Sequence, residues 1–338
     1  MSHHVSLSPL LILLFTTRGL LFWNLATLKL PPDAILKDIA IHKSRAFLAA
    51  PRLNRLQNVT LFEAPWPELS NLTGYASPKL FKPFPSFESQ IPGDCNCLQS
   101  GVSLAMDPKS KFLYVLDTGS KKCYAKLILY DVWFSNFVKH KVLTVDNRHL
   151  NSLILDSATD SLFVSDAGDC SLLMLRTADL EYTKLYPRYN EYIVPVLNLA
   201  VCNGQLYMTS YDSDMMFSVP LQDLHKSASS NLSYLPVQSH FLGYKLGISS
   251  GLYCDEPDGL LYYLIRDFAI VRWNLTLPLI AENHQVLVQS EQVFPYVSEF
   301  FREKSSDHVY ALNSIYNKYH KYTVKIQNKK MFYSYVFT

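Results

Sequence analysis

Glycine is scarce in this chain, with 11 glycines among 338 residues. Tight turns must therefore rely on Asn, Asp, Ser and the 18 prolines. Helical periodicity is also lacking, because no segment longer than about ten residues repeats its apolar positions with the helical period. Helices are therefore expected only as short caps. These absences exclude a helical bundle and favour an all-β fold.

An excess of charge of one sign is absent. The net charge is +2, and Lys and Arg are scattered with no basic stripe interleaved with aromatic residues, so nucleic acid is not expected as a partner. No glycine-rich phosphate loop and no Gly-x-Ser-x-Gly motif occurs. The cysteines do not form two pairs with zinc-ligand spacing. We therefore expect no cofactor and no bound metal.

A long hydrophobic run is missing as well. Val5 to Phe15 is almost unbroken and apolar, but a membrane-spanning helix needs about 20 apolar residues. Arg18 would lie inside such a helix. We interpret residues 1–19 as a cleaved signal peptide and residues 20–338 as one domain, with a retained membrane anchor as the alternative. The mature protein is expected to be secreted, with no membrane partner after cleavage.

Glycosylation motifs and cysteines agree with an extracellular location. Four Asn-x-Ser/Thr motifs occur, at Asn58, Asn71, Asn231 and Asn274. The six cysteines are an even number and none lies in the signal, so they are expected to pair in one of 15 ways. Pairing of Cys95 or Cys97 with Cys123 would close a loop of about 30 residues and contribute about 3 kcal/mol.

A short motif of apolar, aromatic and apolar residues returns six times. Its aromatics are spaced 67, 49, 44, 55 and 48 residues apart, which is the period of a β-propeller blade. The long first interval contains a proline-rich stretch, Leu56 to Pro92, read as a surface excursion. We therefore predict an all-β, six-bladed β-propeller. The copies of this repeat motif are Ala46-Phe47-Leu48, Leu113-Tyr114-Val115, Leu162-Phe163-Val164, Leu206-Tyr207-Met208, Leu261-Tyr262-Tyr263 and Val309-Tyr310-Ala311.

Several motifs in order resemble the yellow and major royal jelly protein family of insects. The resemblance covers about residues 22 to 316 and implies a six-bladed propeller. Its carriers include Pro85-Ser86-Phe87-Glu88, Pro92-Gly93-Asp94-Cys95, Leu113 to Gly119, Arg45 to Arg52, Lys126 to Asp131, Val164 to Ala167, Tyr207 to Pro220, and Asp258 to Leu260 with Ala269 to Asn274.

The resemblance also bears on the cysteines and on a ligand. It implies a bridge from the Cys95/Cys97 region to Cys123, and Cys95 with Cys123 is the pair we expect. Arg272 stands where the family has Cys, and the partners of Cys97, Cys170, Cys202 and Cys254 stay open. Some relatives bind biogenic amines through an Asn and an aromatic near the C-terminus; the nearest equivalents are Asn313 or Ser314, and Tyr316.

The positions that follow each repeat motif form the candidate ring. In a propeller the innermost strands line the axis, so these positions are expected at the channel mouth. A cationic amine would pair with Asp117 or Asp166, beside Ser210 and Asn313, inside an aromatic cage drawn from Tyr211, Phe268 or Tyr316. The alternative is that Asp117 and Asp166 cap the following turns. The full ring is Ala50, Asp117, Asp166, Ser210, Ile265 and Asn313.

Two functions are therefore open. The first is a non-catalytic protein that binds a biogenic amine or catechol at the propeller axis. The second is a pigment-pathway enzyme of the dopachrome-conversion type, which is disfavoured because no His occupies a repeat-equivalent position as general base. A calcium-dependent lactonase or esterase is disfavoured, because Ala50 and Ile265 leave the ring short of the six to eight oxygens that calcium needs.

Overall fold

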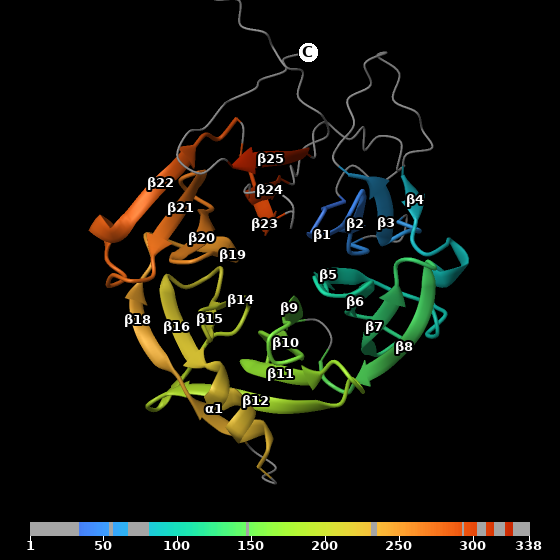
Figure 1. Ribbon diagram of the computed structural model, residues 1–338, viewed down its shortest axis with the longest axis horizontal. Coiled ribbons are helices and arrows are strands. Elements are labelled where there is room, and N and C mark those ends of the chain that lie inside the picture. The colour runs from blue at the N-terminus through green and yellow to red at the C-terminus, as the bar shows by residue number, and fades with distance from the viewer. Residues whose placement is uncertain are drawn as a thin grey trace, which may run out of the picture.

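The computed structural model describes residues 34–53, 57–66, 81–146, 149–230, 235–292, 294–302, 309–313 and 322–326. The expected signal peptide (1–19) and first strand (22–28) lie outside these ranges. The strands form six sheets placed around a central axis (Figure 1). Within the described ranges, no helix has the length and hydropathy of a membrane span.

The first three sheets of the ring follow chain order. The first sheet contains β1 (Asp38–His42), β2 (Arg45–Ala49), β3 (Leu61–Pro65) and β4 (Lys82–Pro83). The second contains β5 (Gly101–Met106), β6 (Phe112–Asp117), β7 (Ala125–Asp131) and β8 (Asn136–Leu143). The third contains β9 (Leu150–Asp156), β10 (Ser161–Asp166), β11 (Ser171–Arg176), β12 (Tyr182–Tyr189), β13 (Tyr192–Ile193) and β17 (Pro236–Gln238).

The remaining sheets complete the ring. The fourth contains β14 (Asn198–Cys202), β15 (Gln205–Thr209), β16 (Met215–Pro220) and β18 (His240–Tyr244). The fifth contains β19 (Ser249–Asp255), β20 (Gly259–Leu264), β21 (Ala269–Asn274) and β22 (His284–Gln289). The sixth contains β23 (Val297–Arg302), β24 (Val309–Asn313) and β25 (Tyr322–Ile326). The helices described are α1 (Leu221–Ala228) and the 3₁₀ turns η2 (Glu88–Gln90) and η4 (Ala281–Asn283).

The β-propeller prediction is confirmed, and its blade number is confirmed only in part. Five sheets have the four or more strands of a complete blade, whereas the sixth sheet has three. The structure thus shows five complete blades instead of six. The chain on either side of β25 lies outside the described ranges.

The radial order of the strands differs from the expectation. The innermost strands β1, β5, β9, β14, β19 and β23 contact one another in sequence around the axis. Every repeat motif lies on the next strand outward, which pairs with a strand on each side. A strand enclosed by sheet neighbours and by adjacent sheets has to be apolar throughout. The repeat motif therefore marks the second strand of each sheet and does not line the axis.

Apolar clusters fill the spaces between adjacent sheets. One cluster joins the first and second sheets through Phe47, Phe84 and Val115, and another joins the sixth and first through Leu48, Trp66 and Leu312. Flat rings pack well in such gaps between blades. The repeat aromatics Phe47, Tyr114, Phe163, Tyr207 and Tyr262 are buried accordingly, and Tyr310 is half-buried.

Side chains of the innermost strands connect neighbouring sheets near the axis. Ser103 on β5 donates from Oγ to Asp38 on β1 at 2.6 Å and accepts from the amide of Leu153 on β9 at 3.0 Å. Ser250 Oγ on β19 donates to the carbonyl of Val297 on β23 at 2.7 Å. Each bond satisfies a polar group that would otherwise be buried alone. Small polar residues therefore position the sheets around the axis.

The ring closes through side chains. The first and sixth sheets lie side by side (Figure 1), and the described strands of each belong to that sheet alone. Ser298 Oγ on β23 donates to the carbonyl of Leu36 at 2.9 Å. Trp66 packs edge-on against Phe301 and Tyr310, at ring separations of 5.5 and 5.1 Å. We call this contact the closing seam.

Candidate functional site

The candidate ring residues meet at one mouth of the propeller. Each second strand ends beside the start of its innermost strand, as the pairs Gly101 with Asp117, Leu150 with Asp166, and Val297 with Asn313 show. Asp117, Asp166 and Asn313 are thus at equivalent places in three sheets. The structure brings them to the same end of the molecule, as the sequence predicts, although on second strands.

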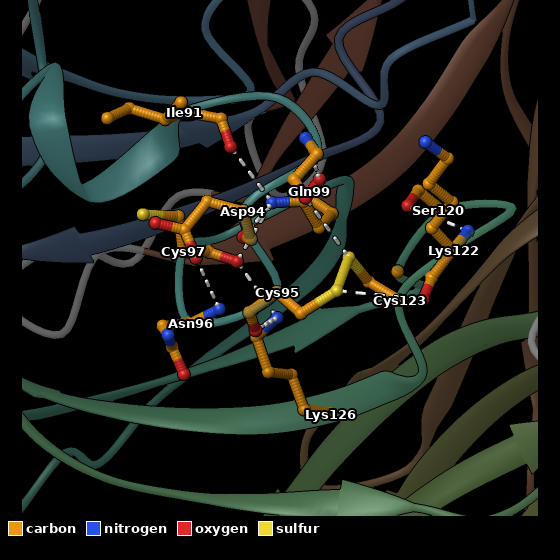
Figure 2. Close-up of a disulfide and its surroundings, with 12 residues drawn as sticks. Ile91, Asp94, Cys95, Asn96, Cys97, Gln99, Ser120, Lys122, Cys123 and Lys126 are labelled. Carbon is orange, nitrogen blue, oxygen red and sulfur yellow. Dashed lines mark hydrogen bonds between the residues drawn. A yellow bond between two sulfur atoms is a disulfide. The ribbon is translucent and has the colours of Figure 1, made fainter.

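A disulfide fixes the mouth loop of the second sheet. Cys95 is bonded to Cys123, which confirms the expected pair (Figure 2). Inside the same loop, Gln99 Nε2 donates to the carbonyls of Ile91 at 3.1 Å and Asp94 at 2.7 Å. These bonds and the disulfide hold the segment before β5 in one conformation.

Arg52 ties two mouth loops together. Its guanidinium donates to the carbonyls of Gln57 at 3.0 Å, Asn58 at 2.6 Å and Leu98 at 3.1 Å, and also to those of Gln90 and Gln99. The loop after β2 and the loop before β5 therefore share one cation. The planar, five-donor guanidinium is suited to such a site, and a lysine would not replace it.

Asp117 is fully engaged in holding the mouth. Its Oδ1 accepts from the amides of Ser100 at 2.7 Å and Gly119 at 2.8 Å. Its Oδ2 accepts from the amide of Gln99 at 2.9 Å and lies 3.1 Å from Lys126 Nζ. The Asp117 side chain is completely buried. The capping interpretation therefore describes this residue, and the carboxylate has no oxygen left for a ligand.

Lys126 and Gly119 complete the surroundings of Asp117. Lys126 Nζ also donates to the carbonyls of Cys95 at 3.1 Å and Cys97 at 2.9 Å, as Figure 2 shows. Gly119 has φ +71°, and a Cβ there would lie 2.3 Å from the carbonyl oxygen of Cys123. Only glycine fits this position, which explains the Asp-Thr-Gly sequence.

Asp166 is held more loosely than Asp117. Its Oδ1 accepts from the amide of Asp169 at 3.4 Å, and its Oδ2 lies 3.4 Å from Lys184 Nζ. Lys184 is closer to Asp169, at 2.5 Å. Burial lowers the pKa of Lys184, but the hydrogen bond to Asp169 and the charge of Asp166 outweigh it and raise the pKa. Asp166 is thus a buried carboxylate that shares its cation, Lys184, with Asp169.

The other candidate ring residues differ in their surroundings. Ser210 Oγ donates to Asp212 Oδ1, and Asn313, fully buried, accepts from the amide of Tyr296 at 3.3 Å. Tyr316 lies outside the described residues, as does Ser314. Of the remaining cage candidates, Tyr211 is 57% exposed. The ring is therefore assembled, but its described members are mostly bonded within the protein.

Lys245 is a buried amine beside Ser210. Its Nζ donates to Ser249 Oγ at 2.7 Å and to the carbonyl of Ser210 at 3.3 Å. Burial lowers the pKa of Lys245 to about 7, although the charges of Asp214 and Asp212 oppose the shift. At neutral pH this mouth therefore contains an amine that is partly uncharged.

Three ionisable groups at the closing seam were not predicted from the sequence. Lys37 precedes β1, Asp38 begins it, and Glu299 lies on β23. Burial raises the pKa of Asp38 to about 6, against its hydrogen bonds to Ser103, Leu104 and Ile39 and the charge of Lys37. Burial and the charge of Asp38 raise the pKa of Glu299 to about 8. Burial lowers the pKa of Lys37, against both carboxylates.

This seam cluster has more acid than base. When all three groups are ionised, two carboxylates face one ammonium in a desolvated place near the axis. Such clusters of shifted groups are concentrated at functional sites. One sequence feature could have pointed to these inner strands: each has a polar residue near its start. No alternating apolar pattern in the sequence marks these residues, which are Asp38, Ser103, Ser152, Asn198, Ser250 and Ser298.

A second disulfide and Asn274 lie away from the mouth, whereas Asn58 lies on the mouth loop after β2. Cys202, at the end of β14, is bonded to Cys254 on β19, a pairing that the sequence left open. Asn58 is exposed, and Asn274 is half-buried with Oδ1 accepting from Thr276. Asn71 and Asn231 lie outside the described residues. Cys97 and Cys170 are free thiols.

Pockets and metal-ligand clusters give no further guide to the axis. A cavity of about 550 Å³ opens between the turns at Asp156, Asn203 and Glu256, at the end of the propeller away from the mouth. No group of three or more His, Cys, Asp or Glu that could hold a metal occurs among the residues that the structure describes.

Comparison with known proteins agrees with the motifs. The family model described as "Major royal jelly protein" matches residues 194–334. "Major royal jelly protein 9" of Apis mellifera is 23% identical over 299 residues, covering 75% of this chain and 68% of the relative.

Solved structures support the fold alone. A structure described as a luciferin-regenerating enzyme superposes with a TM-score of 0.57 at 12% identity, covering 89% of this chain and 94% of that one. The Pan2 WD40 domain of Neurospora crassa superposes with a TM-score of 0.52 at 10% identity, covering 88% and 76%. With the ordered motifs, the family match and the curated relative show similarity to the major royal jelly and yellow protein family and support a divergent member of it.

Proposed function

We propose that this protein is a secreted, non-catalytic binder of a small ligand of the biogenic amine or catechol type at the axis of a six-bladed propeller. In this proposal β23–β25 is the sixth blade. The observation that supports an amine ligand is the excess of acidic groups near the axis, where two carboxyl groups, Asp38 and Glu299, interact with one amine, Lys37. Asp166 adds a loosely paired carboxylate at the mouth. A bound ammonium would relieve the repulsion between these carboxylates.

The extracellular location is supported by three features. The N-terminal apolar run is typical of a cleaved signal peptide. Two disulfides, Cys95–Cys123 and Cys202–Cys254, are bonds that persist in oxidising compartments. Asn58 is exposed, so its side chain is accessible for N-glycosylation.

Calorimetric titration with serotonin and dopamine tests the ligand. We expect saturable binding, weakened about tenfold in Asp166→Asn, because that variant removes a carboxylate charge worth about 1.4 kcal/mol of affinity. Binding should also tighten as the pH rises toward 8, because an ammonium favours ionised Glu299. Asp117 is unsuitable for this test because it caps backbone amides.

Asp179→Asn provides the matched control. Asp179 is also paired with a cation, Arg176 at 2.5 Å, but it is exposed on an outer turn. Its replacement should leave amine affinity unchanged. Absence of heat with either amine, or equal losses in Asp166→Asn and Asp179→Asn, would overturn the proposal.

The enzyme alternative has one observation in its favour. A carboxyl group that titrates near neutrality, as Glu299 does, has the pKa that general acid–base catalysis needs. Under that alternative the wild-type protein accelerates dopachrome conversion above the uncatalysed rate. An absorbance trace identical to the buffer control at high protein concentration would leave binding as the function.

A further inference from the structure

An exposed aromatic turn projects from the second sheet. Trp133 and Phe134, between β7 and β8, are 60% and 71% exposed. Phe137 at the start of β8 is 51% exposed and Val138 is 42% exposed. We call these four residues the aromatic tip. Large apolar side chains gathered at one exposed turn mark a surface that contacts something else.

The backbone of this turn is held firmly despite its exposure. Asp131 Oδ1 accepts from the amides of Trp133 at 2.9 Å and Phe134 at 3.3 Å. Arg45, on β2 of the first sheet, donates to the carbonyl of Val132 and, at 3.0 Å, to Ser135 Oγ. The turn is therefore fixed to a neighbouring sheet, and the rings are presented at a low cost in conformational entropy.

The indole is also oriented. Trp133 Nε1 donates to His42 Nε2 at 3.0 Å. Burial and the charges of Lys43 and Arg45 lower the pKa of His42, which favours the neutral imidazole that can accept this bond. The hydrogen bond to His42 thus fixes the indole of Trp133 beside the turn between β1 and β2, and more than half of its surface remains exposed to solvent.

Lysines surround the exposed rings. Lys43 Nζ lies 4.8 Å from the centre of the Trp133 ring, and Lys111 Nζ lies 4.6 Å from that of Phe134. The nearby acid, Asp131, is buried and is paired with Lys111 at 2.5 Å. The charge of Lys111 is therefore balanced by Asp131, and Lys43 supplies the positive charge beside the exposed rings.

The aromatic tip is remote from the candidate mouth. The turn between β1 and β2 is at the opposite end of these strands from Asp38 and Ala49, which begin and end them at the mouth. Addition of another protein strand to the edge strand β8 is disfavoured because Lys139 and Lys141 lie along it. A planar partner that accepts rings and lysines together fits the tip better than a strand does.

We propose that the aromatic tip docks this protein onto an anionic phospholipid surface. Trp and Phe are favoured at the level of the lipid headgroups, and lysines beside them contact anionic headgroups. One turn with two inserted rings gives reversible attachment. This proposal departs from the expectation of no membrane partner after signal cleavage, and it does not depend on ligand binding at the axis.

Co-sedimentation with vesicles tests it. Full-length mature protein should sediment with phosphatidylcholine vesicles that contain phosphatidylserine, less with phosphatidylcholine alone, and less as salt is raised. Trp133→Ser/Phe134→Ser should lower the vesicle partition constant by about tenfold or more. The tryptophan emission should shift to shorter wavelength on binding in wild type and should not shift in Trp133→Ser/Phe134→Ser; Trp66 and Trp273 are each only 4% exposed.

Tyr124→Ser/Tyr244→Ser is the matched control. These tyrosines are 71% and 59% exposed, close to the values of Phe134 and Trp133, and their loss should not change vesicle binding. The proposal is overturned if wild-type protein stays in the supernatant at low salt, or if both double variants bind equally. A third outcome would also overturn the proposal: wild-type protein does not bind vesicles, and Trp133→Ser/Phe134→Ser has a changed oligomeric state. The tip would then be a contact between copies of the chain.

Discussion

Asp117→Ala is expected to lower the free energy of unfolding by about 3 to 5 kcal/mol, the range for removing one partner of a buried ion pair. The change leaves Lys126 buried without its carboxylate. It also removes the acceptor for the amides of Gln99, Ser100 and Gly119. Urea denaturation of the oxidised protein, followed by fluorescence, measures the loss.

Two further variants separate the causes. Asp117→Asn/Lys126→Met removes both charges together and should cost less than Asp117→Ala, because no unpaired charge is left. Asp179→Ala removes a carboxylate from an exposed pair and should change stability little. If Asp117→Ala unfolds at the same urea concentration as Asp179→Ala, the structural role assigned to Asp117 is wrong.

Glu299→Gln is expected to stabilise the protein increasingly as the pH rises from about 4.5 to about 8. The pKa of Glu299 is raised to about 8 in the folded state, from 4.5. Below pH 4.5 the carboxyl is protonated in both the folded and the unfolded chain, so its ionisation does not reduce the free energy of unfolding. As the pH rises, the unfolded chain ionises first, so wild-type stability falls until the folded pKa is passed. With about 1.4 kcal/mol per pKa unit, the variant should gain about 4 to 5 kcal/mol near pH 8.

The pH window is chosen to isolate this group. Asp38, with its pKa raised to about 6, adds a loss of the same sign at lower pH in both proteins. Lys245 has a pKa of about 7 when folded, so its contribution is constant below pH 7 and is common to both proteins. Glu181→Gln, at an exposed carboxylate, is the control. A gain in Glu299→Gln that does not vary with pH would contradict the raised pKa of the Glu299 carboxyl.

The repeat motif predicted the propeller because apolar strands recur at a blade's period, a signal carried by neighbours in sequence. It did not predict radial order, since the spacing of Phe47, Tyr114 and Phe163 is the same whichever strand is innermost. The expected ring residues do share one mouth. Asp117 proved to be a cap, because its side chain is surrounded by the amides of its own loops.

The seam cluster could not be predicted for a different reason. Lys37 and Glu299 are separated by almost the whole chain, and only ring closure brings them together. The Cys202–Cys254 bond similarly joins two sheets through strands whose proximity depends on the fold. The Cys95–Cys123 bond was predictable because it closes one local loop. Long-range pairings follow from topology, which local patterns do not encode.

The closing seam has a consequence for local opening. Every other boundary between adjacent sheets is also crossed by the peptide chain, whereas in the described residues the first and sixth sheets are joined by side chains alone. Because no described peptide segment spans this boundary, we expect the amides of β23 and β1 to be the least protected of the innermost strands. Amide hydrogens in these strands are expected to exchange during transient openings in which the first and sixth sheets separate and the other sheets stay joined. Protonation of Glu299 makes such openings rarer.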